Sequence, residues 1–104
     1  MAPDAKTLMR SRYCAYVLDE LDYLMATWHA STRPSVLEPN GPDVKWLGLD
    51  VRNAIQQDPD HATVEFVARY RVKGQAVRLH EMSRFVREHG QWFYIDGDVN
   101  APRL

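Results

Sequence analysis

Three polar side chains near the end of the chain have types and a spacing that could bind a ligand or perform acid–base chemistry. Glu81 and Ser83 are two residues apart in a segment with strand-like alternation, and Asp96 lies in the next such segment. Alternate residues of a strand share one face of a sheet. A two-residue turn at His89-Gly90 would place Ser83 opposite Asp96. We therefore expect the three side chains to meet on a face that is otherwise apolar.

Each of these residues also has a structural explanation. An unpaired carboxylate is unfavourable in apolar surroundings, so Glu81 must pair, become protonated or face a wet cavity. We expect it to form a structural ion pair with Arg12 from the first helix, and the alternative is a ligand-binding or general-base role. Asp96 precedes Gly97 at a strand end, where it could cap a turn. Ser83 could be a buried, hydrogen-bonded hydroxyl.

Two further groups could border the same pocket. Trp28 continues a helical apolar stripe with Leu24, which is typical of a core residue. His29 could stabilise the end of a helix or act as an acid or base near neutral pH. Arg33 could bind an anion or fasten the loop that contains Pro34. We place His29 and Arg33 at the rim of the pocket.

No pattern in the sequence predicts a metal site or a reactive thiol. The histidines at 29, 61, 80 and 89 share no ligand spacing, and His80 and Glu81 point to opposite faces of one strand. Cys14 is the one cysteine of the chain, so it cannot form an intrachain disulfide. We interpret it as a small hydrophobic residue of a helix. We expect no cofactor and no bound metal.

The alternation of apolar residues predicts four consecutive antiparallel strands. A turn at Gly74-Gln75 pairs Ala68 with Glu81, and a shift by one residue would bury arginines. An alternating segment upstream adds the first strand of the meander and puts Asn53 on the inner face. The predicted polar residues of the inner face are Asn53, Tyr70, Glu81, Ser83, Tyr94 and Asp96.

The opposite, outer face of this sheet is expected to carry basic side chains and an apolar patch that is ringed by arginines. We interpret the basic side chains as a solvated surface; they are Arg69, Arg71, Arg78 and His80. Arg84 is expected to pair with Glu65. An apolar patch on this face predicts a homodimer through the sheet. Its residues are Val67, Met82, Val86, Phe93 and Ile95.

Two helices are expected before the sheet. Apolar residues between positions 8 and 18 recur at three- and four-residue spacing, with Asp4 as a possible N-cap. A second helix is predicted to open at Asp19 and to end at Trp28-His29. Residues 34–43 contain three prolines and one glycine and are predicted to be a loop.

This order of elements predicts an α+β cone, in which N-terminal helices pack in a curved antiparallel four-strand meander and a cavity lies between them. Several segments resemble the YchJ-like family of bacterial proteins from about Thr7 to Gly97: LMRSRYCAYVLDELDYLMATWHASTRP, TVEFVARYR, LHEMSRF and the W-x-Y-x-D-G motif. The resemblance implies the nuclear transport factor 2-like, or cystatin-like, fold. Many members also carry a cysteine-rich SEC-C zinc motif, which these 104 residues lack. The resemblance therefore implies no zinc binding here, and we expect a single domain, 1–104, to be the functional unit.

The composition predicts one small soluble domain. Its 13 Lys and Arg residues against 14 Asp and Glu give a net charge of -1, so there is no electrostatic reason to expect binding to nucleic acid or to an anionic membrane. No apolar run approaches the roughly 20 residues that span a bilayer, and no signal-peptide pattern begins the chain. We expect a cytoplasmic protein.

Three classes of function are compatible with these features. We favour a non-catalytic binding module whose cavity holds a small apolar or amphipathic molecule. One alternative is a protein-interaction domain that acts through the outer face of the sheet. The other is an isomerase- or hydrolase-type enzyme with Glu81 or Asp96 as general base and Tyr70 or Tyr94 as hydrogen-bond donor. The expected pocket residues are Tyr16, Trp28, Tyr70, Glu81, Ser83, Tyr94 and Asp96.

Overall fold

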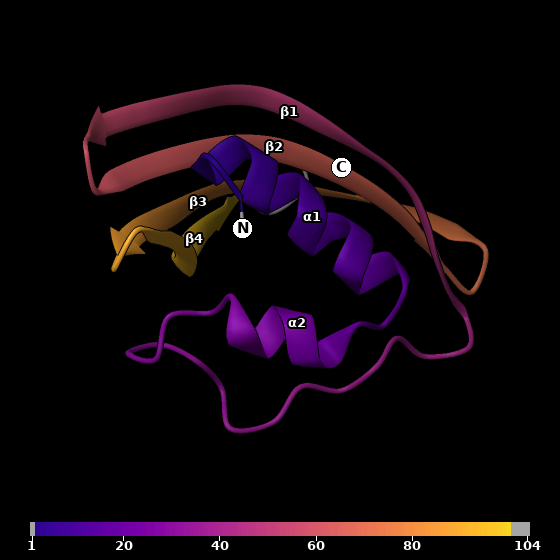
Figure 1. Ribbon diagram of the computed structural model, residues 1–104. Coiled ribbons are helices and arrows are strands. Elements are labelled where there is room, and N and C mark those ends of the chain that lie inside the picture. The colour runs from indigo at the N-terminus through magenta and orange to yellow at the C-terminus, as the bar shows by residue number, and fades with distance from the viewer. Residues whose placement is uncertain (1, 101–104) are drawn as a thin grey trace.

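A long, curved antiparallel sheet lies over two helices (Figure 1). The computed structural model describes residues 2–100. Helices α1 (Ala5–Val17) and α2 (Leu21–Ala26) precede the strands, which are β1 (Val44–Asp58), β2 (His61–Val72), β3 (Gln75–Glu88) and β4 (Gln91–Asn100). The strands are hydrogen-bonded in the order β1-β2-β3-β4, so the chain forms a meander. The predicted α+β fold is confirmed.

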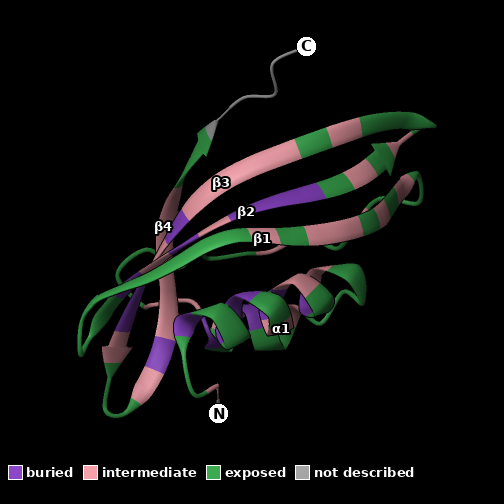
Figure 2. Ribbon diagram, turned by 90° about the horizontal axis from the view of Figure 1, so that it is seen from above, coloured by how far each residue is buried: buried purple, intermediate pink, exposed green. Residues whose placement is uncertain are grey.

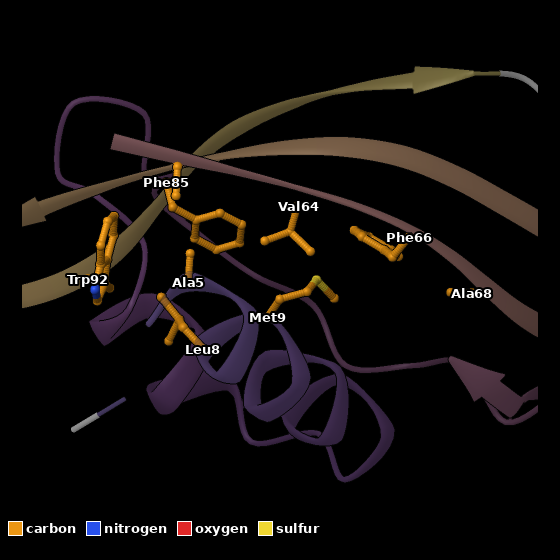
Figure 3. Packing of buried hydrophobic residues seen from close by; sticks show 9 residues of the cluster. Ala5, Leu8, Met9, Val64, Phe66, Ala68, Phe85 and Trp92 are labelled. Carbon is orange, nitrogen blue, oxygen red and sulfur yellow. The ribbon is translucent and has the colours of Figure 1, made fainter. Parts of the chain in front are cut away.

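Helix α1 begins at the predicted N-cap. The carboxylate of Asp4 accepts a hydrogen bond from the backbone N–H of Thr7 at 2.7 Å, which satisfies one of the free donors of the first turn. The apolar face of α1 packs against the inner face of the sheet and forms the main core (Figure 3). Core residues are Ala5, Leu8, Met9, Val64, Phe66, Phe85 and Trp92.

Helix α2 is shorter than the sequence predicts. Asp19 does not open it, because this residue has a φ of 55° and turns the chain between the helices. The helix ends at Ala26, so Trp28 lies beyond it. Here the chain runs beside β4: the N–H of Tyr94 donates to the carbonyl of Thr27 at 2.9 Å, and the N–H of His29 donates to the carbonyl of Tyr94 at 2.8 Å. The segment after α2 therefore covers the edge of β4.

The turn between β2 and β3 is one residue earlier than predicted. It is formed by Lys73 and Gly74, which both have positive φ, as in a type I′ hairpin turn. The true register therefore pairs Phe66 with Glu81, not Ala68 with Glu81. Moving the turn by one residue shifts the pairing by two residues, which keeps every side chain on its predicted face.

The turn between β3 and β4 lies at His89-Gly90, as predicted, and Phe85 pairs with Tyr94. Beyond this pair a β-bulge interrupts the register, and Arg84 pairs with Asp96. A bulge inserts one extra residue into a strand and so exchanges the faces of the residues that follow.

Strand β1 contains three such irregularities, and one of them lies between Val51 and Asn53. Asn53 consequently pairs with the outer-face residue Glu65 and is exposed, so its predicted inner position is wrong. Figure 2 shows that burial is concentrated on β2 and on the side of α1 that faces the sheet, whereas the second half of β1 is exposed. Among residues 2–100, no helix is long and apolar enough to cross a membrane.

Candidate functional site

A cavity of about 350 Å³ lies between α1 and the inner face of the sheet. Much of its wall is apolar, formed by residues of α1, β2 and β3; these are Met9, Phe66, Ala68, Leu79 and Phe85. Polar side chains are added by both layers and by the loop before β1; these are Arg12, Tyr13, Tyr16, Glu38, Asn40, Glu81, Ser83 and Tyr94. Four of the predicted pocket residues therefore line this cavity, namely Tyr16, Glu81, Ser83 and Tyr94.

One oxygen of the Glu81 carboxylate accepts hydrogen bonds from two neighbouring hydroxyl groups. Ser83 Oγ donates to Glu81 Oε2 at 2.5 Å, and Tyr94 Oη donates to the same oxygen at 3.3 Å. Ser83 is only 1% exposed, so its hydroxyl needs this acceptor. Within residues 2–100 no hydrogen bond reaches the other oxygen, Oε1. Glu81 therefore has an acceptor that a bound molecule could use.

Gly97 makes room for this carboxylate. The bulge in β4 brings Gly97 opposite Ser83, and a Cβ atom at Gly97 would overlap the carboxyl group of Glu81. A role for Gly97 in the site was not predicted from the sequence. A signal was present, because a glycine inside a strand often marks the close approach of another group.

The predicted ion pair between Arg12 and Glu81 is not formed among the described residues. Arg12 Nη1 instead donates to the carbonyl oxygen of Leu24 at 2.9 Å and to Thr27 Oγ1 at 2.7 Å. The guanidinium carbon lies 5.1 Å from the ring centre of Trp28 and 4.7 Å from that of Tyr94. Burial lowers the pKa of Arg12. This arginine therefore fastens α1 to α2 through neutral acceptors and aromatic faces.

Two tyrosines of the cavity, Tyr16 and Tyr94, have a raised pKa and keep their phenolic protons at neutral pH. Burial raises the pKa of Tyr94, and the negative charge of Glu81 raises it further. Burial also raises the pKa of Tyr16, where the charge of Arg12 opposes the shift and that of Glu81 adds to it. Both phenols can therefore act as hydrogen-bond donors at neutral pH.

The family of the chain follows from comparison with known proteins. Residues 4–97 match the family described as YchJ, middle NTF2-like domain. The chain belongs to this family. A UPF0225 protein of Bordetella pertussis is 66% identical over 98 residues, which are 94% of this chain and 74% of that protein. One from Methylibium petroleiphilum is 60% identical over 101 residues, which are 97% of this chain and 74% of that protein.

Two solved structures share the fold of this YchJ-family domain. A SEC-C motif containing protein from Rhodopseudomonas palustris has a TM-score of 0.80 and 29% identity, and the match covers 97% of this chain and 80% of that one. A SEC-C motif containing protein from Psychrobacter arcticus has a TM-score of 0.74 and 26% identity, and the match covers 100% of this chain and 66% of that one. The likeness supports the NTF2-like fold.

Asp96 does not reach the cavity of this YchJ-family domain. The bulge turns it to the outer face, where its carboxylate accepts a hydrogen bond from Arg84 Nε at 2.6 Å. Asp98 binds the same guanidinium at 2.8 Å. The predicted pair of Arg84 with Glu65 is also wrong, because Glu65 binds His80 Nε2 at 2.6 Å. Asp96 is therefore part of a surface ion-pair network.

Trp28 and Tyr70 lie next to the cavity without lining it. Trp28 packs edge-on against Tyr94, with ring centres 5.1 Å apart, and its indole N–H has no partner among the described residues. The ring of Tyr70 lies 5.0 Å from that of Trp46. Each ring therefore supports an aromatic residue that does line the cavity.

The two predicted rim residues anchor loops. His29 binds Glu88 through Nε2 at 2.9 Å and Ser31 through Nδ1 at 2.7 Å. The guanidinium of Arg33 donates twice to the carbonyl of Trp28, at 3.1 and 2.9 Å. Neither side chain lines the cavity, so the loop-fastening alternative describes Arg33.

One wall of the cavity is aromatic and was not predicted from the sequence. Tyr13 and Trp46 meet edge-on at 5.7 Å, and Trp46 Nε1 donates to Asn40 Oδ1 at 3.2 Å. The amide of Asn40 in turn donates to the carbonyl of Tyr16 at 2.6 Å. The loop before β1 thereby closes one side of the cavity. Trp46 escaped notice because the irregularity between it and Gly48 shifts the alternation of β1.

The described residues contain no group of three or more His, Cys, Asp and Glu side chains that could hold a metal ion. Cys14 is exposed rather than packed in a core. It lies on α1 and is not part of the cavity wall.

Proposed function

We propose that this YchJ-family domain binds a small amphipathic molecule in the cavity between α1 and the sheet. The observation that carries the proposal is the position of Glu81, whose carboxylate lines an otherwise largely apolar cavity and keeps Oε1 without a partner among residues 2–100. A volume of about 350 Å³ lies within the range of small-molecule sites. Such sites typically combine apolar walls with a few fixed polar groups.

The lining defines the chemistry of the ligand. Met9, Phe66 and Leu79 would contact an apolar body, and removal of that surface from water would favour binding. Glu81 would accept a hydrogen bond from a hydroxyl, amide or amine group at the end of this body. Ser83 and Tyr94 hold the carboxylate in place, which reduces the entropy that binding must overcome. We therefore expect ligands with an apolar body and one terminal hydrogen-bond donor.

A general-base role for Glu81 is the second candidate. It is favoured by the hydroxyl of Tyr94, which lies beside the carboxylate and could donate to a developing negative charge on a substrate. Asp96 is not a candidate base for this cavity, because it is bound by Arg84 on the outer face. Turnover of a bound molecule, measured against a Glu81→Gln variant, distinguishes catalysis from binding alone.

A thermal-shift screen of apolar alcohols, amides and amines tests the proposal. Ligands should raise the melting temperature of the wild-type domain, because binding to the folded state stabilises it. Glu81→Gln should reduce this shift, since the amide replaces part of the acceptor. Glu65→Gln is the matched control, because Glu65 is a carboxylate on the neighbouring strand that faces outward and binds His80. Equal shifts in both variants would exclude Glu81 as the recognition group.

A further inference from the structure

We propose that the outer face of the sheet near the β2–β3 turn binds an acidic, extended peptide segment of another protein. This surface, here called the basic cluster, contains five exposed cations. They lie on β1, β2 and β3, which are neighbours in the sheet (Figure 1), and on the turn that joins β2 to β3. They are Lys45, Arg69, Arg71, Lys73 and Arg78. The proposal concerns the face opposite the cavity and does not depend on the proposed ligand.

The cations of the basic cluster face one another across the strands. Lys45 pairs with Arg71 on adjacent strands, and Arg69 pairs with Arg78. Side chains in such pairs have Cβ atoms about 5 Å apart, and like charges placed this way destabilise a sheet. The chain as a whole carries a net charge of -1, so the cluster does not follow from a generally basic composition.

Other cations of the sheet behave differently. Arg84 forms ion pairs with Asp96 and Asp98, and Arg87 forms one with Asp60. Arg52 and the histidines at 61 and 80 also have carboxylate partners. Within residues 2–100, none of the five cations of the basic cluster forms an ion pair. The cations of the basic cluster are therefore available to pair with an anion from outside the described chain.

The spacing of the basic cluster matches an extended polypeptide. Arg69 and Arg71 are two residues apart on β2, which separates their Cα atoms by about 6.6 Å. Carboxylates at alternate positions of an extended peptide repeat at the same distance. Each guanidinium can bind a carboxylate through two parallel hydrogen bonds. An Asp- or Glu-rich segment that runs along β2 would therefore meet successive arginines with successive carboxylates.

The surface is less suited to nucleic acid. No aromatic side chain belongs to the basic cluster, so it offers no surface on which bases could stack. The cluster also holds five of the 13 Lys and Arg residues, which leaves the rest of the chain net acidic. A long polyanion would extend beyond the basic cluster, where the rest of the chain offers no net positive charge to hold it. A short acidic peptide would remain within the basic cluster.

Fluorescence anisotropy with a labelled peptide of alternating glutamate and serine tests the proposal. The intact chain should bind this peptide, and added salt should weaken the binding. The double variant Arg69→Gln/Arg78→Gln should bind about tenfold more weakly, since it removes one facing pair of cations. It should unfold no more readily than the wild type, because the pair that it removes is repulsive.

Lys6→Gln/Arg10→Gln is the matched control. It removes the same net charge from exposed positions of α1 and should leave the affinity for the peptide unchanged. An equal loss in both double variants would show attraction by net charge alone and would overturn the proposal. Absence of binding to the wild type would also overturn it. Tighter binding to a single-stranded oligonucleotide of equal charge would assign the basic cluster to nucleic acid instead.

Discussion

Gly97 is the residue on which the position of the Glu81 carboxylate depends most directly. A Gly97→Ala substitution would place a methyl group where the carboxyl group now lies, so Glu81 would have to move away from Ser83 and Tyr94. We expect the free energy of unfolding to fall by about 2 kcal/mol, from overpacking and from the weakened hydrogen bonds. Urea denaturation measures this change.

Gly48→Ala provides the control for this prediction. Gly48 also lies in a strand, but a Cβ atom there would meet nothing within 4 Å. We expect this variant to be within about 0.5 kcal/mol of the wild type. An equal loss of stability in both variants would mean that replacing a strand glycine, rather than contact with Glu81, causes the effect.

Because of Tyr94, the free energy of unfolding of the domain should depend on pH in the alkaline range. Its pKa is raised above the ordinary value of 10.0 by burial and by Glu81. The folded state therefore holds the phenolic proton more tightly, so this contribution is fully present below pH 10 and is lost as the pH rises above it. As the pH rises above 10, the free energy of unfolding should therefore decline less steeply in the Tyr94→Phe variant than in the wild type.

Chemical denaturation at several pH values from neutral to strongly alkaline checks this prediction. Other groups also titrate in alkali, so the comparison between variants is the decisive quantity. A Tyr94→Phe curve parallel to the wild-type curve would contradict the prediction.

At the level of elements, Arg12 joins the two helices. It is 4% exposed, donates to Leu24 and Thr27 of the α2 region, and contacts two aromatic rings. Arg12→Ala should lower the free energy of unfolding by about 3 kcal/mol, because hydrogen bonds to a charged group and cation–π contacts are lost together. Arg10→Ala, on the exposed side of the same helix, should change it by less than about 0.5 kcal/mol. Similar losses in both would contradict this role.

The β3–β4 hairpin contains a residue in the left-handed conformation, which is uncommon for residues other than glycine. His89 has a φ of 52° and precedes Gly90, which also has a positive φ. Asparagine adopts this conformation more readily, and Asn-Gly is a preferred pair in such turns. His89→Asn should therefore raise the free energy of unfolding by about 0.5 kcal/mol, whereas His89→Val should lower it. Thermal unfolding of the two variants would reveal the opposite signs.

The sequence predicted those elements whose pattern is unbroken. Asp4 marked the start of α1, and His89-Gly90 marked the last turn, because a cap and a turn are local arrangements that a few residues determine. Asn53 and Asp96 were assigned to the wrong face for a common reason. Strand bulges interrupt the two-residue alternation, so the residues beyond each bulge lie on the face opposite to the predicted one.

Contacts between elements were the least predictable part of the site. The expected ion pair with Glu81 placed Arg12 toward the cavity, but its true partners depend on where α2 packs against α1. Similarly, Asn40 lies in a loop without periodicity, so its contact with Trp46 could not be inferred. The positions of Glu81 and Ser83 on β3 were predicted correctly, because a shift of the register by two residues left both side chains on the inner face.

For the whole molecule, the homodimer through the outer face stays a prediction. Val67 and Val86 of the predicted apolar patch are already buried within one chain, at 0% and 9% exposure, which leaves Met82, Phe93 and Ile95 partly exposed. If this surface forms a two-fold dimer, Met82→Glu introduces two charges and should halve the mass measured by light scattering. Leu18→Glu, at an exposed position at the end of α1, should leave the mass unchanged. A wild-type mass of one chain at high micromolar concentration would contradict the dimer.

The covering of β4 by the segment after α2 has a consequence for aggregation. That segment occupies part of one edge of the sheet through hydrogen bonds to Tyr94. Among the described residues, no backbone hydrogen bond from outside the sheet satisfies β1 beyond its first residue, so β1 is the open edge. Growth of a fibre by strand addition needs two free edges on each molecule. Strand addition at β4 would therefore have to displace the segment after α2 or use the residues beyond Tyr94, whereas the edge of β1 can pair with another strand directly.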